Sequence, residues 1–288
     1  MSNLMTGLVK TRHVDKTKVV SGGAVLVAYS TGPTRIGAPA LVFLHAGVSD
    51  SRLWAHQFDT FGSRHRVVAF DRRGFGATAA VDEHFSSVDD LIAVLDALTI
   101  PRAVLIGCSQ GGRIALDATL AYPERVAGLV LVAAAIGGAP ESATHDPRLD
   151  ALTAAYEEAE QADDRDARNR IAAHIWLDGP FSVEGRVSGP ARELFFAMNR
   201  IVLGGPQLGT ADVPDTAWGR LGDIAVPTMV MWGPLDVPSV VANLRHAVAT
   251  IPRATACEFE GVAHLPSLET PDRFDAGLAT FLHDVAIV

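Results

Sequence analysis

A single serine stands between glycines in the stretch Gly107-Cys108-Ser109-Gln110-Gly111, directly after an apolar run. A glycine-x-serine-x-glycine pattern between a strand and a helix is typical of a nucleophile turn, a sharp bend that presents the serine hydroxyl to a substrate. Side chains at positions 107 and 111 would collide with such a bend, which explains both glycines. The backbone amide of Gln110, where the helix begins, would then point to the substrate oxygen on which charge develops.

A serine hydroxyl needs a base to become a nucleophile, and the base needs an acid to hold it. Asp236 and His264 each follow an apolar run later in the chain. Both have ordinary explanations too: Asp236 could cap the next helix, although Ser239 could do so equally well, and His264 could be a plain loop histidine. The residue types and their order predict Ser109, Asp236 and His264 as nucleophile, acid and base.

A second amide for the same oxygen is expected in Leu44-His45-Ala46-Gly47-Val48, the loop after the first core strand. Glycine lets the backbone approach a ligand closely, so the amide of Gly47 is the predicted donor. His45 is interpreted as a structural histidine that braces this loop. The charged loop Asp71-Arg72-Arg73-Gly74-Phe75-Gly76 is interpreted in the same way, as a brace between neighbouring loops.

The scaffold for these residues is predicted from a regular alternation of strands and helices. It begins with a hairpin over 14–20 and 24–28. The later strand candidates are nearly unbroken apolar runs, at 40–44, 66–70, 103–108, 129–133, 228–232 and 257–259. Helical spacing lies between or after them, at 52–61, 88–98, 112–121, 237–249 and 270–283. Strands that are apolar on both faces are typical of a parallel sheet between helices. The predicted fold class is therefore α/β, with a mostly parallel central sheet and helices on both faces.

The alternation stops between residues 137 and 219. Helix-like stretches at 149–161, 163–176 and 190–203 follow one another there, with glycine–proline punctuation at 179–180, 189–190 and 204–206. We interpret 137–219 as a helical cap over one end of the sheet, inserted into a core of residues 1–136 and 220–288. A longer run of ordinary surface helices is the alternative.

Composition limits the other function classes. The 288 residues carry a net charge of −9, which argues against nucleic acid or an anionic membrane as a partner. The two cysteines form no CxxC pair, so a cysteine metal site is not predicted. The N-terminal residues lack the apolar segment of a signal peptide, and the longest apolar run, 127–139, is too short to span a bilayer. A cytoplasmic protein is expected, and a homodimer is an open alternative.

Five of these stretches, in this order, resemble the α/β-hydrolase fold superfamily: 44–47, 71–76, 107–112, 233–236 and 261–269. The resemblance covers residues 20–136 and 220–285, and the helical insertion falls where such enzymes carry a cap. Most relatives have His-Gly where this chain has His45-Ala46-Gly47. The glycine of this chain therefore stands one position later than in most relatives, which leaves the amides of Gly47 and Val48 as alternatives for the second oxyanion donor.

The resemblance implies acyl transfer without metal or organic cofactor. His264 would take the proton of Ser109, which attacks an ester carbonyl, while Asp236 holds the imidazole. The amides of Gln110 and Gly47 would bind the oxyanion. Dehalogenases and epoxide hydrolases of this fold use aspartate at the turn, so the serine favours a carboxylic ester hydrolase acting on small to medium esters. A lactonase, a C–C bond hydrolase, a cofactor-free perhydrolase or haloperoxidase, and a non-catalytic small-molecule receptor remain alternatives.

The substrate pocket is expected to be mostly apolar. The predicted lining residues are Trp176, Phe195, Phe196, Met198 and Trp218 from the cap, with Val48, Leu235, Val237 and Leu265 from loops of the core. Arg52 and Arg113 are candidates to meet a substrate carboxylate.

Overall fold

The structure is a computed structural model that describes residues 9–10, 12–35, 37–140, 146–205 and 209–286. Its centre is an eight-stranded sheet with the order β1-β2-β4-β3-β6-β7-β9-β10. These strands are β1 (Asp15–Ser21), β2 (Ala24–Thr31), β3 (Ala40–Leu44), β4 (Val67–Asp71), β6 (Ala103–Cys108), β7 (Val126–Val132), β9 (Thr228–Trp232) and β10 (Ala254–Glu258). β2 pairs antiparallel with β1 and β4, and every other pair of neighbours is parallel. The predicted fold class is confirmed.

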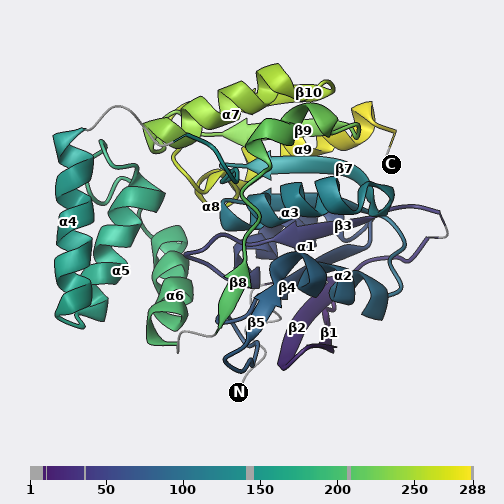
Figure 1. Ribbon diagram of the computed structural model, residues 1–288, viewed down its shortest axis with the longest axis horizontal. Coiled ribbons are helices and arrows are strands. Elements are labelled where there is room, and N and C mark those ends of the chain that lie inside the picture. The colour runs from purple at the N-terminus through teal and green to yellow at the C-terminus, as the bar shows by residue number, and fades with distance from the viewer. Residues whose placement is uncertain (1–8, 11, 36, 141–145, 206–208, 287–288) are drawn as a thin grey trace.

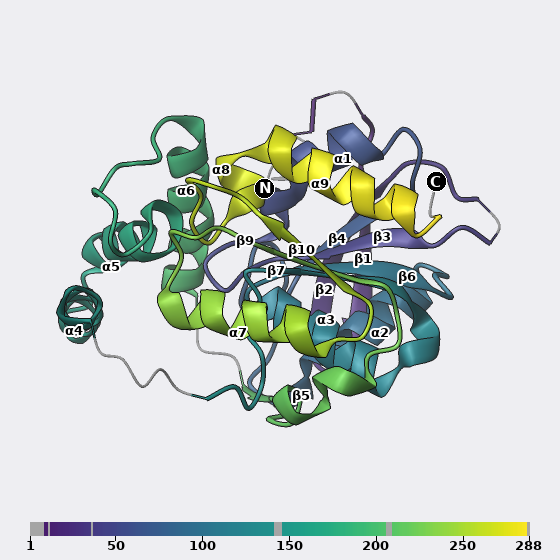
Figure 2. The same cartoon turned by 90° about the horizontal axis from the view of Figure 1, so that it is seen from above.

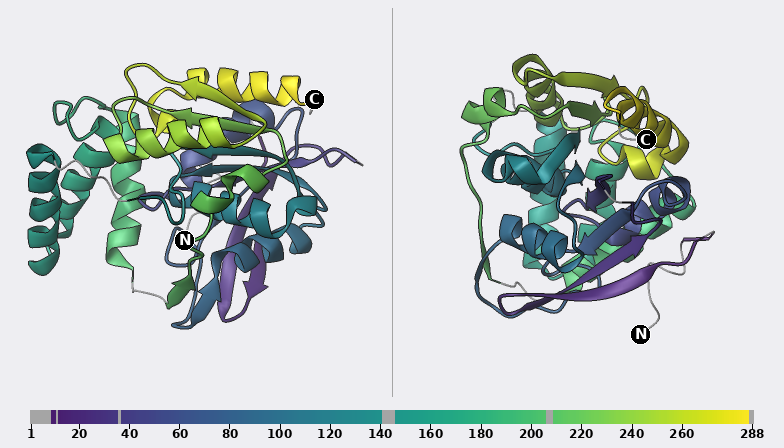
Figure 3. Two further views of the ribbon diagram at one scale, coloured as in Figure 1. Left: turned by 45° about the horizontal axis from the view of Figure 1, so that its top comes forward. Right: turned by 90° about the vertical axis from the view of Figure 1, so that its right-hand side faces the viewer.

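The central strands are apolar because both of their faces are covered. Every residue of β3, β4, β6 and β9 is buried. Burying one aliphatic side chain of this size stabilises the fold by about 1.5–3 kcal/mol, so these runs dominate the core. The outer strands β1 and β10 keep exposed positions. Figure 3 shows the twist of the sheet, with β1 and β2 running at a steep angle to the central strands.

Helices form one layer on each face of the sheet (Figure 2). One layer holds η1 (Ser51–Trp54), α1 (Ala55–Phe61), α8 (Pro266–Glu269) and α9 (Pro271–Asp284). The other holds α2 (Ser87–Ala97), α3 (Gln110–Ala121), α7 (Pro238–Thr250) and η4 (Trp218–Asp223). A short turn, η2 (Pro123–Arg125), leads into β7. The sheet is thus sandwiched between two hydrophobic clusters, one under each layer.

The segment between β7 and β9 contains the inserted helices. They are α4 (Pro147–Gln161), α5 (Arg165–Ala173), the π-helical turn η3 (His174–Asp178) and α6 (Pro190–Gly204). Figure 1 shows them standing together beside one end of the sheet. The chain then returns to the core, where β8 (Thr210–Asp212) pairs in parallel with β5 (His84–Ser86). The helical part of the predicted cap therefore runs from 147 to 204, and residues 210–212 lie on the core.

The parallel strands point their carboxyl ends to the same edge of the sheet. The loops after β3, β4, β6, β9 and β10 emerge there, next to the inserted helices (Figure 1). Ligands of open α/β sheets bind at this edge, so the fold gathers the loops that carry the candidate residues. Within the described residues, no helix has both the length and the apolar character needed to cross a membrane.

Candidate active site

Ser109 occupies a strained turn between β6 and α3. Its backbone angles, φ 54° and ψ −117°, lie in a region that residues with a side chain rarely adopt. Such a conformation costs on the order of 1–3 kcal/mol and persists only when its surroundings enforce it. Here the Ser109 amide donates to the carbonyl of Val132 at 2.9 Å, and its carbonyl accepts from Arg113 and Ala135 at 3.0 and 3.1 Å. The turn is therefore held from both sides.

The two flanking glycines are required by close backbone contacts. A Cβ atom on Gly107 would lie 2.3 Å from the carbonyl oxygen of Gly111. A Cβ on Gly111 would lie 2.3 Å from the carbonyl oxygen of Leu44, at the end of β3. The glycines thus let the nucleophile turn press against the strand beside it.

We expect Gly111→Ala to destabilise the protein by about 3 kcal/mol, because backbone atoms of β3 have no room to move away. Chemical denaturation followed by circular dichroism measures this loss. Gly222→Ala is the matched control, since its Cβ would meet nothing within 4 Å. Its stability should stay within about 0.5 kcal/mol of the original. Equal stability of the two variants would contradict the close packing described here.

His264 and Asp236 form a buried pair. Nδ1 of His264 lies 2.7 Å from Oδ2 of Asp236, and the two residues are only 3% and 2% exposed. The other carboxylate oxygen accepts a 2.7 Å hydrogen bond from the amide of Val237. Helix α7, whose N-cap is Val237, has no side-chain cap. Asp236 therefore holds the imidazole and does not act as the side-chain cap of α7, and Nε2 of His264 stays free of this pairing.

The His264 loop also touches the nucleophile turn. Sγ of Cys108, the residue before Ser109, lies 3.8 Å from the carbonyl oxygen of His264. Cys108 is fully buried, and this burial raises the pKa of its thiol well above the usual range. A thiol that stays protonated and inaccessible is a poor nucleophile. The structure thus brings His264, Asp236 and the Ser109 turn into one cluster, with Cys108 packed beneath it.

Glu269 is a residue of this site that the sequence did not reveal. Its carboxylate accepts hydrogen bonds from the amides of Ala263 and Leu265, the residues on either side of His264, at 3.0–3.1 Å. Arg186, in the inserted segment, pairs with the same carboxylate and donates to the carbonyl of Gly261 at 2.9 Å. Glu269 therefore fixes the histidine loop and ties it to the insertion. The only hint of Glu269 in the sequence is the presence of a carboxylate five positions after His264.

The loop after β3 lies against the nucleophile turn. A Cβ atom on Gly47 would lie 2.8 Å from Cδ of Gln110, so the two predicted oxyanion donors belong to segments in contact. His45 is fully buried: its Nδ1 lies 2.8 Å from the carbonyl of Ala46, and its Nε2 accepts from the amide of Arg72 at 3.1 Å. Burial lowers the pKa of His45, so the ring is neutral with the proton on Nδ1. This agrees with its interpretation as a brace.

The charged loop after β4 is also a brace. The carboxylate of Asp71 accepts from the amides of Ser51 and Ala77 at 3.0 and 2.8 Å. Burial raises the pKa of Asp71 to about 6. Arg73 pairs with Asp90 and Glu83.

Of the predicted pocket residues, Trp176 has a ring contact with the candidate base, whereas several others are buried core residues. The Trp176 ring is 4.6 Å from the His264 imidazole, and the backbone of Gly179 approaches that of Leu235. Phe195, Met198 and Leu265 are fully buried in the hydrophobic cluster against which Trp176 and Phe196 pack, and Val237 is 9% exposed. Trp218 does not join this group. Its ring stacks on His246 of α7 at 4.1 Å, on the other face of the sheet, so it packs the core instead of the cap.

A pocket of about 380 Å³ opens between the inserted helices and the loop after β3, and Ser109, Asp236 and His264 are not among the residues that line it. Gly47 and Val48 form its core side, and Tyr156, Asn199 and Val202 belong to its cap side. Two arginines line it, and both are neutralised: Arg73 by Asp90 and Glu83, and Arg168 by Glu160. The pocket next to the predicted oxyanion loop therefore offers polar groups, and neither of the arginines that line it is unpaired.

The two predicted carboxylate-binding arginines are engaged elsewhere. Arg52 pairs with Asp50 at 2.7 Å and donates to the carbonyl of Ala197, which ties the core to α6. Arg113 donates to the carbonyl of Pro214 at 2.7 Å. Neither is free for a substrate.

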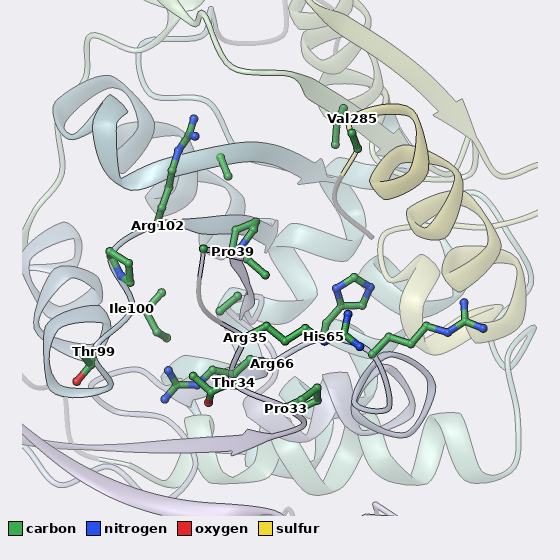
Figure 4. Close-up of a pocket in the computed structure, with 17 residues that line it drawn as sticks. Pro33, Thr34, Arg35, Pro39, His65, Arg66, Thr99, Ile100, Arg102 and Val285 are labelled. Carbon is green, nitrogen blue, oxygen red and sulfur yellow. The ribbon is translucent and has the colours of Figure 1, made fainter.

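A second cavity lies at the opposite edge of the sheet. It has about 540 Å³ and is lined by residues that precede the strands, among them Arg35, Arg66 and Arg102 (Figure 4). Arg102 points away from the end of the cavity that holds Arg35 and His65, so these side chains do not converge. No residue of the Ser109 cluster lines it. Among the described residues, no three histidine, cysteine or acidic side chains gather as metal ligands would.

Known proteins share this architecture. A family model described as alpha/beta hydrolase fold matches residues 39–271. The 2-hydroxy-6-oxo-6-phenylhexa-2,4-dienoate hydrolase of Burkholderia cepacia is 26% identical over 257 residues, which cover 84% of this chain and 87% of that protein. Epoxide hydrolase 4 of Mus musculus is 37% identical over 101 residues, but these span only 33% of this chain and 28% of the relative. A solved structure described as "Est816 as an N-Acyl homoserine lactone degrading enzyme" superposes with a TM-score of 0.72 at 26% identity, covering 92% of this chain and 100% of that one.

Proposed function

The chain belongs to the alpha/beta hydrolase family, and on that premise we propose that it is a serine hydrolase of small to medium carboxylic esters. The observation that carries the proposal is the buried Asp236–His264 pair, 2.7 Å apart, in a loop that touches the strained Ser109 turn. A serine in such a turn beside an oriented imidazole is the arrangement that acyl transfer needs.

The proposed reaction has two halves. His264 takes the proton of the Ser109 hydroxyl as Oγ bonds to the ester carbonyl carbon, whose oxygen becomes an oxyanion. The tetrahedral species collapses, and the leaving alkoxide takes the proton from His264. Water then attacks the acyl group with His264 again as the base, and the acid leaves as Ser109 recovers its proton. Asp236 holds the imidazole and stabilises its charged form throughout.

The oxyanion is assigned to the backbone amides of Gln110 and Gly47. Gln110 begins α3, so its amide lies at the positive end of the helix dipole. Gly47 lies against the Gln110 side chain, which supports its amide as the second donor over that of Val48. Each donor of this kind typically lowers the barrier by about 3 kcal/mol.

Charge balance in the 380 Å³ pocket supports an uncharged substrate. Both of its arginines are already paired with carboxylates, so a substrate carboxylate would find no free partner there. Moving an unpaired carboxylate from water into the pocket costs free energy, and a neutral ester or lactone avoids this cost. The similarity to Est816, described as degrading an N-acyl homoserine lactone, supports lactones as the second candidate class. Lactone opening uses the same steps, except that the leaving alcohol stays attached.

A substrate panel tests this proposal. We expect turnover of p-nitrophenyl acetate and butyrate and of an uncharged lactone. The p-nitrophenyl monoester of succinic acid, close in length to the butyrate ester but anionic, should have a kcat/KM at least about tenfold lower, a difference of ~1.4 kcal/mol in the barrier. A preference for the succinate monoester would contradict the neutral pocket. Thermal stabilisation by these ligands without any turnover would favour the receptor alternative and overturn the hydrolase.

A further inference from the structure

The carbonyl oxygen of Ala46 is surrounded by donors. Nδ1 of His45 lies at 2.8 Å, Nη2 of Arg72 at 3.2 Å, the Ser49 amide at 3.3 Å and the Ser49 hydroxyl at 3.4 Å. One of these donors is a cation, and hydrogen bonds from charged donors are roughly twice as strong as neutral ones. A loop carbonyl in this crowded state has a fixed direction.

That carbonyl shares a peptide unit with the amide of Gly47. The peptide group is planar, and in its trans form the C=O and N–H bonds point in opposite directions. Donors that fix the Ala46 oxygen on one side therefore aim the Gly47 N–H to the other side. They also draw electron density toward the oxygen, which makes the N–H a stronger donor, because linked hydrogen bonds polarise one another.

Arg72 is unusual among the arginines of these loops because it has no carboxylate partner. Arg52 and Arg73 both pair with aspartates, whereas no ion pair of Arg72 occurs within the described part of the chain. Its Nη1 instead donates to Oε1 of Gln110 at 3.3 Å, and its guanidinium carbon lies 4.4 Å from the centre of the Phe75 ring. Burial lowers the pKa of Arg72 to about 9, which leaves the group charged at neutral pH.

We propose that Arg72 is a positioning residue for the oxyanion hole: it holds the Ala46–Gly47 peptide and the Gln110 side chain together and supplies an uncompensated positive charge behind the Gly47 amide. This role rests on the proposed serine hydrolase function. A nearby half-buried cation without a carboxylate interacts most favourably when a negative charge forms on the other side of the peptide. Its benefit therefore appears in the transition state, not in the substrate complex.

The test compares Arg72→Met with Arg72→Lys. The first removes the charge at similar length, and the second keeps it. Both are assayed with p-nitrophenyl butyrate, and active sites are counted by titration with a fluorophosphonate. We expect kcat per active site to fall about 10- to 100-fold in Arg72→Met with KM within threefold, somewhat less than for direct loss of an oxyanion donor. Arg72→Lys should recover part of this loss.

A trifluoromethyl ketone separates positioning from plain structural support, because it forms a tetrahedral oxyanion with the serine. Its affinity should fall with kcat in Arg72→Met, by the same factor. Arg125→Met is the matched control: Arg125 also holds backbone carbonyls, those of Pro101 and Ile100, at the other edge of the sheet. Its variant should lose thermal stability but keep kcat per active site.

Three results would overturn the proposal. The first is a kcat per active site in Arg72→Met within threefold of the wild type. The second is a lower kcat with unchanged affinity for the ketone. The third applies if Arg72→Met does not fold, and it is an unchanged affinity of Arg72→Lys for the ketone. The proposal expects weaker binding there, because the lysine ammonium cannot reach the Ala46 carbonyl and Oε1 of Gln110 in the same way. A wild type that neither turns over esters nor reacts with the fluorophosphonate would instead refute the proposed function itself.

Discussion

Ser109→Ala is expected to lower kcat for p-nitrophenyl butyrate by about 10⁶-fold, the loss typical of removing a serine nucleophile. This corresponds to ~8 kcal/mol in the barrier. The hydroxyl is the group that would bond to the substrate, and no neighbour offers a replacement: the adjacent Cys108 is fully buried and its thiol pKa is raised by burial. The fold should persist, because the turn is held by backbone contacts that alanine keeps. Steady-state kinetics and thermal unfolding measure both effects.

Covalent labelling gives the same prediction a second readout. In the wild type, Oγ of Ser109 should displace fluoride from a fluorophosphonate while His264 takes the hydroxyl proton. The product carries one phosphonyl group on Ser109. Peptide mass spectrometry should find it between Gly107 and Gly111. Ser267→Ala is the control, since this serine is 2% exposed and its hydroxyl has no hydrogen-bond partner among the described residues. It should keep full activity and labelling. An adduct on another residue, or turnover by Ser109→Ala near that of the wild type, would refute the assignment.

The backbone explains why so much of this site was predictable from sequence. A nucleophile turn needs glycines where Cβ atoms would meet backbone at 2.3 Å, so it leaves a local signature at Gly107 and Gly111. The strands are equally predictable from sequence, because burial on both faces requires unbroken apolar runs such as 103–108. Asp236 and His264 directly follow such runs. Local steric and burial constraints thus fix the fold class and the positions of the candidate triad.

The features that sequence did not reveal depend on contacts between distant segments. Glu269 accepts from two nearby amides, but its pairing with Arg186, 83 residues away, ties the histidine loop to the insertion, and nothing near Glu269 in the sequence requires that pairing. Trp218 is predicted to be a cap residue because it falls within the predicted insertion 137–219, yet its ring stacks on His246 of α7. β5 and β8 are three-residue strands with partly exposed side chains, too short for a periodic pattern. Such pairings are decided by tertiary packing, which local pattern does not encode.

Replacing one carboxylate oxygen of Asp236 by an NH₂ group is the sharpest test of His264 as the base, because both oxygens of Asp236 have defined partners. Asp236→Asn is expected to lower kcat by about 10⁴-fold at neutral pH while the fold persists. The carboxylate accepts from Nδ1 of His264 and from the amide of Val237, each at 2.7 Å. Asparagine has one oxygen, and Val237 can retain it. Its NH₂ group then faces Nδ1, which must accept a hydrogen bond. The ring proton would move to Nε2, and a protonated Nε2 cannot take the proton of Ser109.

Asp275→Asn is the matched control for this substitution, because Asp275 is also buried, at 6% exposure, but lies in α9 and accepts from Gln57. Its kcat per titrated active site should equal that of the wild type, whatever happens to its stability. The rate of fluorophosphonate labelling should fall with kcat in Asp236→Asn, since both reactions need the same proton transfer. A loss of less than tenfold in both would mean that His264 does not depend on Asp236 for its tautomer, and the base of this site would have to be oriented by another group.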